Sequence, residues 1–191
     1  METEEKELEL RMYFFVPYNV SEIAKGIQSG HASLEYVLRY GLSDEVVNFL
    51  TNWKTWIILN GGTTNDERDF KDIPKGTLNQ IADQLQENDI KFSYFREPDL
   101  NYALTAICFI VDERVFNKKD YPNFVDYLIE SKKHSTHLNG LYDYDDDFLL
   151  EKMDKTELVM QFPDYYKSWI RSIGGIKNEF LRELISDKKL A

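Results

Sequence analysis

Cysteine is nearly absent from this chain of 191 residues: Cys108 is the only one, so an internal disulfide is excluded. Cys108 lies in an apolar run, which predicts an inert core residue. Long hydrophobic runs are also lacking, because no stretch approaches the roughly 20 apolar residues of a membrane-spanning helix. The opening METEEKELELR has no apolar segment of the kind found in secretory signals. We therefore expect a cytoplasmic protein with no membrane partner.

Basic residues are few relative to acidic ones, since 23 Lys and Arg stand against 34 Asp and Glu and give a formal net charge of −11. Proteins bind phosphate backbones through Lys and Arg, so the overall charge does not favour a nucleic acid as partner. The paired lysines at 118–119, 132–133 and 188–189 are interpreted as solvated surface. A hydrophobic content of 42% with 14% aromatic residues nevertheless predicts a folded protein with a core.

The chain changes character near Asp112, which indicates two parts. Before it, apolar and alternating runs predict strands, and longer periodic segments predict helices, in the order strand 12–16, helix 19–39, helix 43–53, strand 54–59, helix 76–87, strand 90–95 and strand 102–111. This order predicts an α/β domain over 11–115 with a mixed sheet. Residues 1–10 are interpreted as an acidic leader. Residues 116–191 are interpreted as a helical C-terminal extension packed on the core, with a break near 174–175.

The helix predicted over 19–39 carries the main functional signal. Its apolar residues follow the helical period and are expected to face the core; they are Ile23, Ile27, Leu34, Val37 and Leu38. An aspartate at position 27 should therefore unfold the domain. Gly26 and Gly30 fall on one side, where a backbone or a ligand can approach closely. Gln28 and His31 are neighbours on the helix surface. Tight packing on a sheet and a functional amide–imidazole pair both fit this pattern.

The segments Gln28-Ser29-Gly30-His31-Ala32, Glu97-Pro98-Asp99-Leu100-Asn101 and Thr105-Ala106-Ile107 suggest a family. Over about residues 12–112 the chain resembles the archaeal and eukaryotic (class II) peptidyl-tRNA hydrolases, whose first helix carries a motif of the form GKxAxQxxHA. The resemblance implies a three-layer α/β/α domain on a four-stranded mixed sheet, tRNA as the partner of an active enzyme, and no cofactor. The family is often dimeric, so a homodimer is one expectation.

This chain departs from the family pattern at two places. The family's lysine, four residues before the glutamine, corresponds to Ala24; Lys25 follows one residue later, which turns its side chain by about 100° around the helix. The family's acidic loop has an Asp followed by Gly-Arg-Thr, a string that is missing here, so both Glu97 and Asp99 are candidates for the acidic residue.

The chemistry that the resemblance implies is ester hydrolysis on a peptidyl- or aminoacyl-tRNA. Glu97 or Asp99 would orient a water molecule as general base, and Gln28 or Lys25 would stabilise charge on the ester oxygen. On the substrate-binding side we expect His31, Asn101 and Thr105, although His31 and Thr105 also fit purely structural roles. The alternative is a catalytically inactive member of the fold that binds a protein partner through its acidic surface or its aromatic-rich tail.

Two further groups of residues are candidates for sites. His134 and His137, with Asp143 and the acidic run 145–147, fit a divalent metal in residue type. The spacing lacks the regularity of a calcium loop, so a solvated acidic loop is preferred and no metal is expected. The segment 60–64, NGGTT, follows a predicted strand but lacks the Lys-Ser/Thr of a P-loop, which favours a plain turn.

Overall fold

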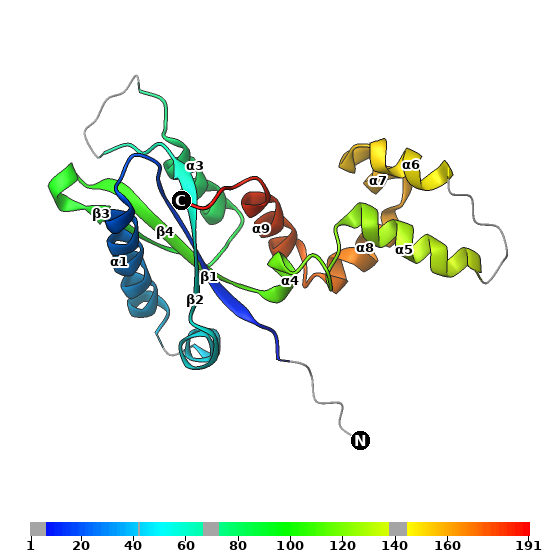
Figure 1. Ribbon diagram of the computed structural model, residues 1–191, viewed down its shortest axis with the longest axis horizontal. Coiled ribbons are helices and arrows are strands. Elements are labelled where there is room, and N and C mark those ends of the chain that lie inside the picture. Colours follow the sequence, from blue (N-terminus) through cyan, green and yellow to red (C-terminus); the bar gives the residue numbers. More distant parts are fainter. Residues whose placement is uncertain (1–6, 42, 67–72, 138–144) are drawn as a thin grey trace. The chain divides into compact units, whose positions relative to one another are not determined.

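The computed structural model describes residues 7–41, 43–66, 73–137 and 145–191 (Figure 1). The chain divides into two compact units, the first made of residues 1–113 and 180–191 and the second of residues 114–179. Residues 180–191 therefore belong to the first unit, whereas the sequence predicts a single extension over 116–191. The reason lies at the C-terminus, where Leu190 forms a bridge with Leu59 and the amide of Ala191 donates to the carbonyl of Ile58.

The first unit follows the predicted alternation of strands and helices. In chain order its elements are β1 (Leu10–Pro17), α1 (Glu22–Tyr40), α2 (Asp44–Asn48), the π-helix η1 (Phe49–Trp53), β2 (Thr55–Gly62), α3 (Thr77–Glu87), β3 (Ser93–Glu97), the 3-10 helix η2 (Pro98–Leu100) and β4 (Ala103–Asp112). The C-terminal part of α9 (Ile176–Ser186) completes it. β1 begins at Leu10, inside the segment expected to be a leader.

A four-stranded mixed sheet lies at the centre of the first unit, with strand order β2-β1-β4-β3. β1 is parallel to β2 and antiparallel to β4, and β3 pairs antiparallel with β4. The central strand β1 is covered on both faces, so Phe14 and Phe15, which point in opposite directions, are both fully buried. The predicted α/β fold with a mixed sheet is confirmed.

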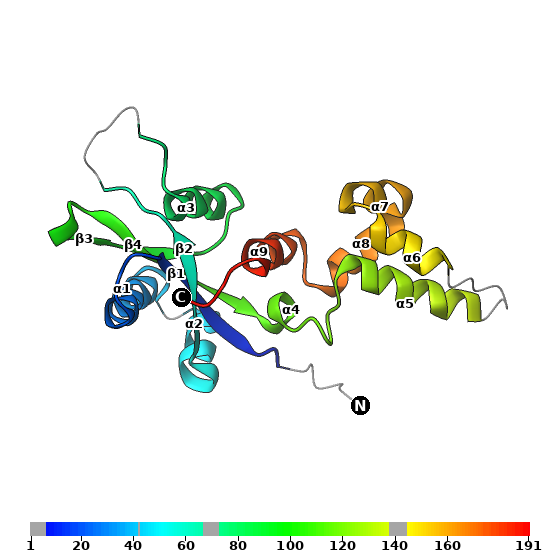
Figure 2. The ribbon, with the colours of Figure 1, turned by 45° about the horizontal axis from the view of Figure 1, so that its top comes forward.

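Helices cover both faces of this sheet, and Figure 2 shows α1 and α3 on opposite sides of it. On the side of α1, Ala32 and Tyr36 pack with the even-numbered residues of β1 and β4 and with Val46 of α2. On the other side α3 contributes the buried residues Leu78, Ile81 and Leu85. This arrangement places the amide-bearing face of α1 against the sheet.

The orientation of α1 differs from the prediction. Its buried residues are Lys25, Gln28, Ser29, Ala32 and Tyr36. Most of the apolar residues expected in the core face solvent instead, with exposures of 79% for Ile23, 53% for Ile27, 64% for Leu34 and 78% for Leu38; only Val37 packs partly against the core. The prediction of the buried face was therefore wrong, because the periodicity of the apolar residues locates an apolar stripe without showing what covers it.

The second unit is helical, with α4 (Glu113–Phe116) at its boundary, then α5 (Phe124–His137), α6 (Asp145–Lys152), α7 (Lys155–Gln161) and α8 (Pro163–Ser172). Its core surrounds Trp169, whose indole N–H donates to the carbonyl of Pro122 at 2.9 Å. The predicted break between the last helices is confirmed at Gly174 and Gly175, both with positive φ. None of the helices in the described ranges combines the length and apolar character needed to cross a bilayer.

Candidate functional site

Three side chains from distant parts of the sequence meet at one end of the sheet. The Thr105 hydroxyl on β4 donates to Gln28 Oε1 on α1 at 2.6 Å, and Gln28 Nε2 donates to Glu97 Oε2 at the end of β3 at 2.7 Å. Thr105 is 1% exposed and Gln28 is 8% exposed, while Glu97 is half-buried. The structure therefore brings the predicted amide and one predicted carboxylate into direct contact.

The hydrogen bonds determine the orientation of the Gln28 amide. An ionised carboxylate only accepts, so the NH₂ group must face Glu97, and the carbonyl oxygen is then left for the Thr105 hydroxyl. A charge-assisted bond on one side and a short buried bond on the other hold the side chain in a single rotamer. Gln28 therefore presents its amide to Glu97 in a preorganised position.

A β-bulge turns Thr105 toward α1. Phe95 pairs with Ala106 and Arg96 pairs with Leu104, so Thr105 is the extra residue on β4. In regular alternation Thr105 would lie on the opposite side of the sheet from Ala106, which packs with α1. Bulges re-aim side chains in this way, and here the bulge lets Thr105 reach Gln28.

The turn that follows Glu97 has an unusual backbone. Asn101 and Tyr102 both adopt left-handed conformations, with φ of 50° and 55°. Left-handed geometry is uncommon for a residue as bulky as tyrosine. The turn is closed by the amide of Tyr102, which donates to the carbonyl of Glu97 at 3.0 Å, and by the Arg96 guanidinium, which donates to the carbonyl of Tyr102 at 3.1 Å. These bonds hold the end of β3, and with it Glu97, in place.

Lys25 lies on the same buried face of α1 as Gln28, one turn earlier. Its ammonium group pairs with Glu22 Oε1 at 2.7 Å, and the Lys25 side chain is 11% exposed. Lys25 stands one residue later than the lysine of the family pattern, yet it is among the buried residues of α1. Its partner Glu22 was missed by the sequence reasoning, although an acidic residue three positions before a lysine is a recognisable helical pairing.

The other predicted residues lie around this cluster without joining its hydrogen bonds. His31 is exposed and stacks on Phe95, with ring centroids 4.5 Å apart and an interplanar angle of 26°. Asp99 and Asn101 are exposed in the turn. Of the two acidic candidates, Glu97 is therefore the one in contact with Gln28. Phe95, which the sequence reasoning did not single out, connects the parts: its ring lies on His31 and its carbonyl lies 3.4 Å from the Thr105 hydroxyl.

The remaining predicted features have structural explanations or lie outside the described side chains. Cys108 is fully buried, its Sγ donates to the carbonyl of Ala32, and burial raises the pKa of the thiol, so the predicted place of Cys108 in the core is confirmed. The side chains of His134, His137 and Asp143 lie outside the described residues. Among the described residues, no three or more His, Cys, Asp or Glu side chains lie close enough together to hold a metal ion.

The segment 60–64 is not a phosphate site. Its first three residues belong to β2, which extends to Gly62. The backbone amides at the start of α3 are already bonded within the chain, because Leu78 donates to the carbonyl of Thr63 and Thr77 donates to the hydroxyl of Thr63. A helix start whose amides are satisfied in this way has lost the donors that bind an anion.

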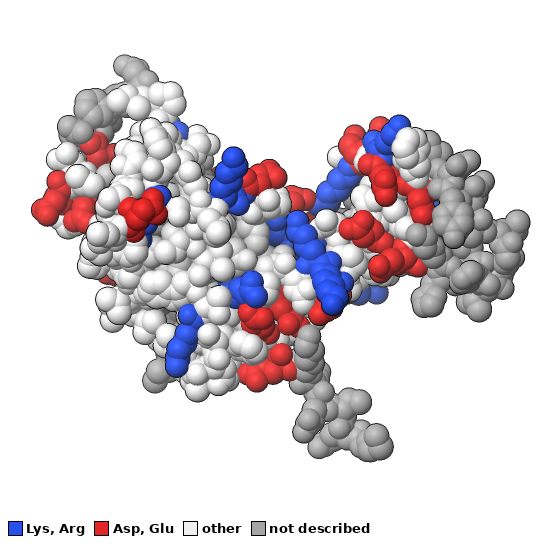
Figure 3. Space-filling model, in the orientation of Figure 1, with Lys and Arg blue, Asp and Glu red and all other residues white. Residues whose placement is uncertain are grey.

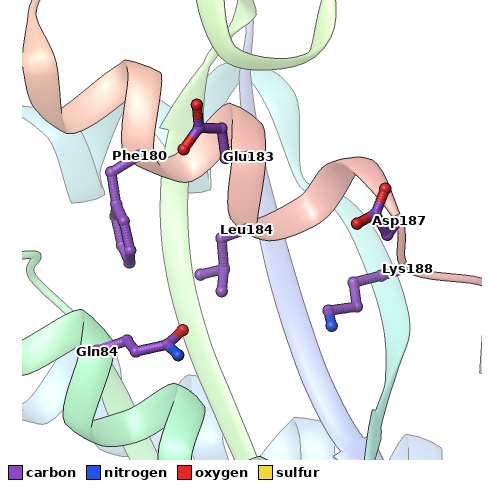
Figure 4. Close-up of a pocket in the computed structure, with 6 residues that line it drawn as sticks. All are labelled: Gln84, Phe180, Glu183, Leu184, Asp187 and Lys188. Atoms are coloured by element: carbon purple, nitrogen blue, oxygen red, sulfur yellow. The ribbon is translucent and has the colours of Figure 1, made fainter. Parts of the chain in front are cut away.

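A separate groove of about 380 Å³ lies between α3 and α9 (Figure 4). Phe180 and Leu184 point toward Gln84 across it, and Glu183, Asp187 and Lys188 complete its lining. Because α3 covers the opposite face of the sheet from α1, this groove is distinct from the Gln28 cluster.

Comparison with protein-family models finds no match, and comparison with curated protein sequences finds none either.

Proposed function

We propose that the first unit is a divergent peptidyl-tRNA hydrolase-like enzyme that cleaves the ester bond of a peptidyl- or aminoacyl-tRNA. The observation that carries the proposal is the Thr105–Gln28–Glu97 chain of hydrogen bonds at the end of the sheet. It joins the Gln-His-Ala segment and the acidic loop, which are the two parts of the sequence that resemble the family. The enzyme needs no cofactor in this proposal.

The proposed reaction assigns a role to each side chain. Glu97 Oε1 accepts a proton from a water molecule as the water oxygen adds to the ester carbonyl carbon. The second N–H of Gln28 and the Lys25 ammonium stabilise the negative charge on the former carbonyl oxygen. The tetrahedral intermediate then collapses, the bond to the ribose oxygen breaks, and Glu97 returns the proton to that oxygen. The products are a free carboxylic acid and the ribose hydroxyl.

Substrate binding in this proposal uses residues around the cluster. His31, stacked on Phe95, offers an exposed ring against which a terminal base can stack. Asn101 offers an exposed amide in the adjacent turn. On the face shown in Figure 3, acidic and basic side chains are interspersed, so contacts near the reacting end would contribute more of the affinity than a broad basic surface.

The experiment is release of labelled peptide from a peptidyl-tRNA by the full chain. Wild type should turn over above the buffer background. Glu97→Gln keeps the hydrogen bond acceptor but removes the base, so it should lower the rate by about 100-fold or more. Asp99→Asn is the matched control, since Asp99 lies exposed in the same turn and should retain the wild-type rate.

Equal loss in both variants would contradict the assignment of Glu97 as the base. Wild-type protein without turnover would reject catalysis and leave the second candidate function, a catalytically inactive fold member that binds a protein partner.

Two observations favour this second function. The net charge of −11 opposes the binding of a polyanion, and α1 exposes four large aliphatic side chains. A homodimer is compatible with either function.

A further inference from the structure

The groove between α3 and α9, which we call the α3–α9 groove, has an apolar wall that is partly open to solvent. Phe180 and Leu184 form this apolar wall; they lie one turn apart on α9, are half-buried, and point toward α3 (Figure 4). The volume of about 380 Å³ lies at the lower end of the range for small-molecule sites. The groove therefore has room for one aromatic ring or a short aliphatic chain.

Both helices that form the α3–α9 groove are anchored in the first unit, to which α9 belongs from Phe180 onward. Ile81 of α3 is buried, and so is Leu181 of α9. The residues after α9 are tied to β2 by the bridge between Leu190 and Leu59. A groove with walls held in this way is preformed, so a ligand does not have to order the helices on binding.

Two polar side chains point into the groove beside the apolar wall. In Figure 4 the Gln84 amide on α3 and the Lys188 ammonium after α9 both point into the space that Leu184 faces. Within the part of the chain that the structure describes, neither of these two side-chain groups makes a hydrogen bond or an ion pair. An amide NH₂ and an ammonium group both donate hydrogen bonds, and the ammonium is positively charged. The polar end of the groove therefore suits an anionic acceptor.

The two acidic residues of the lining are directed elsewhere. Figure 4 shows that the carboxylates of Glu183 and Asp187 point away from Gln84, and Asp187 accepts from the Ser186 hydroxyl at 3.3 Å. Both acidic residues are exposed, so water and salt screen their charges from the space inside the groove. A ligand in that space would contact the Lys188 ammonium directly, and a direct contact outweighs a screened charge.

We infer that the α3–α9 groove binds a small carboxylic acid with an apolar body, the carboxylate on Lys188 and Gln84 and the body against the apolar wall. A charge-assisted hydrogen bond from Lys188 holds the carboxylate, and a ring of the ligand can stack on Phe180. One ammonium group matches a single negative charge, which favours a carboxylate over a phosphate ester with a charge of about −2. Because the groove and the Gln28 cluster lie on opposite faces of the sheet, the inference does not depend on the proposed hydrolysis.

The first test is an NMR titration of the full chain with three probes that share one body: hydrocinnamate, hydrocinnamide and phenylpropylamine. Hydrocinnamate should saturate and shift the side-chain amide signals of Gln84. The other two probes lack the negative charge, so they should bind at least about 10-fold more weakly. Acetate, which lacks the ring, should also bind more weakly. Equal or tighter binding of the amine, no saturation by hydrocinnamate, or unchanged Gln84 signals would each overturn the inference.

The second test reverses the charge in the groove. Lys188→Glu should weaken hydrocinnamate binding by at least about 10-fold and strengthen that of phenylpropylamine, and the exposed position of Lys188 makes misfolding unexpected. Lys189→Glu is the matched control, since Lys189 is exposed, changes the net charge equally and does not line the groove. Equal effects of the two variants would show that net charge selects the ligand, and would overturn the inference. Both tests measure binding, so they can fail separately from the hydrolysis assay.

Discussion

The substitution Thr105→Val removes one hydroxyl from the Thr105–Gln28–Glu97 chain while keeping the shape of the side chain. Thr105 is 1% exposed, and its hydroxyl donates to Gln28 Oε1 at 2.6 Å. Without it, the Gln28 carbonyl oxygen stays buried and unsatisfied. Such a loss costs about 1–3 kcal/mol, and we expect about 2 kcal/mol of unfolding free energy here.

The reverse removal, Gln28→Leu, should cost less, about 1 kcal/mol. The freed Thr105 hydroxyl can turn to the carbonyl of Phe95, now 3.4 Å away, and the half-buried Glu97 can be solvated. Replacing both partners by apolar groups is often close to neutral. The two single losses add up to about 3 kcal/mol, so the double variant should be more stable than this sum predicts by about 1–3 kcal/mol.

Urea unfolding of wild type, both single variants and the double variant measures this coupling. Thr51→Val is the control for the loss of a hydroxyl, because Thr51 is exposed in η1 and its change should stay within about 0.5 kcal/mol. Thr105→Val within the same limit, or additive losses in the double variant, would refute the hydrogen-bond chain that supports the proposed site.

Three other predictions concern the folded unit itself. Ile27→Asp, measured at low protein concentration, should change the unfolding free energy by no more than about 0.5 kcal/mol, because Ile27 is 53% exposed; loss of the cooperative thermal transition would show that the residue is buried. In urea unfolding, Gly26→Ala should stabilise the chain by up to about 1 kcal/mol, because the added Cβ enters open space within a helix. Gly62→Ala should destabilise the chain, because Gly62 has a φ of 79° and the added Cβ would run into the Thr77 side chain. The opposite order of stabilities would contradict both placements. Burial raises the pKa of the Cys108 thiol and of the Tyr36 phenol, so the folded state keeps protons that the unfolded state releases above about pH 8.5 and pH 10 respectively. The urea midpoint of unfolding should therefore stay level below those pH values and fall above them, and in Cys108→Ala the fall should begin at higher pH. A midpoint that rises with pH would contradict the predicted direction.

Local pattern was enough to find most of the elements. A helix was predicted over 19–39 and is observed over Glu22–Tyr40, and the apolar runs mark β1, β2 and β4. The β3 strand was placed three residues early at its start, since Asp89 adopts a left-handed conformation and residues 90–92 lead into the strand without joining it. Propensity and periodicity are properties of neighbouring residues, so the sequence by itself determined the α/β class and the Gln-His-Ala helix.

Only the tertiary structure decided which face of α1 is buried and which acidic residue meets Gln28. The sheet covers the polar side of the helix, and Glu97 contacts Gln28 across 69 positions of sequence while Asp99 stays exposed two residues later. The bulge at Thr105 depends on the pairing of β3 with β4, which no local pattern encodes. Hydrophobic periodicity identifies a side of a helix that avoids water, but whether the sheet or a second molecule removes it from water is decided by contacts between residues far apart in the chain.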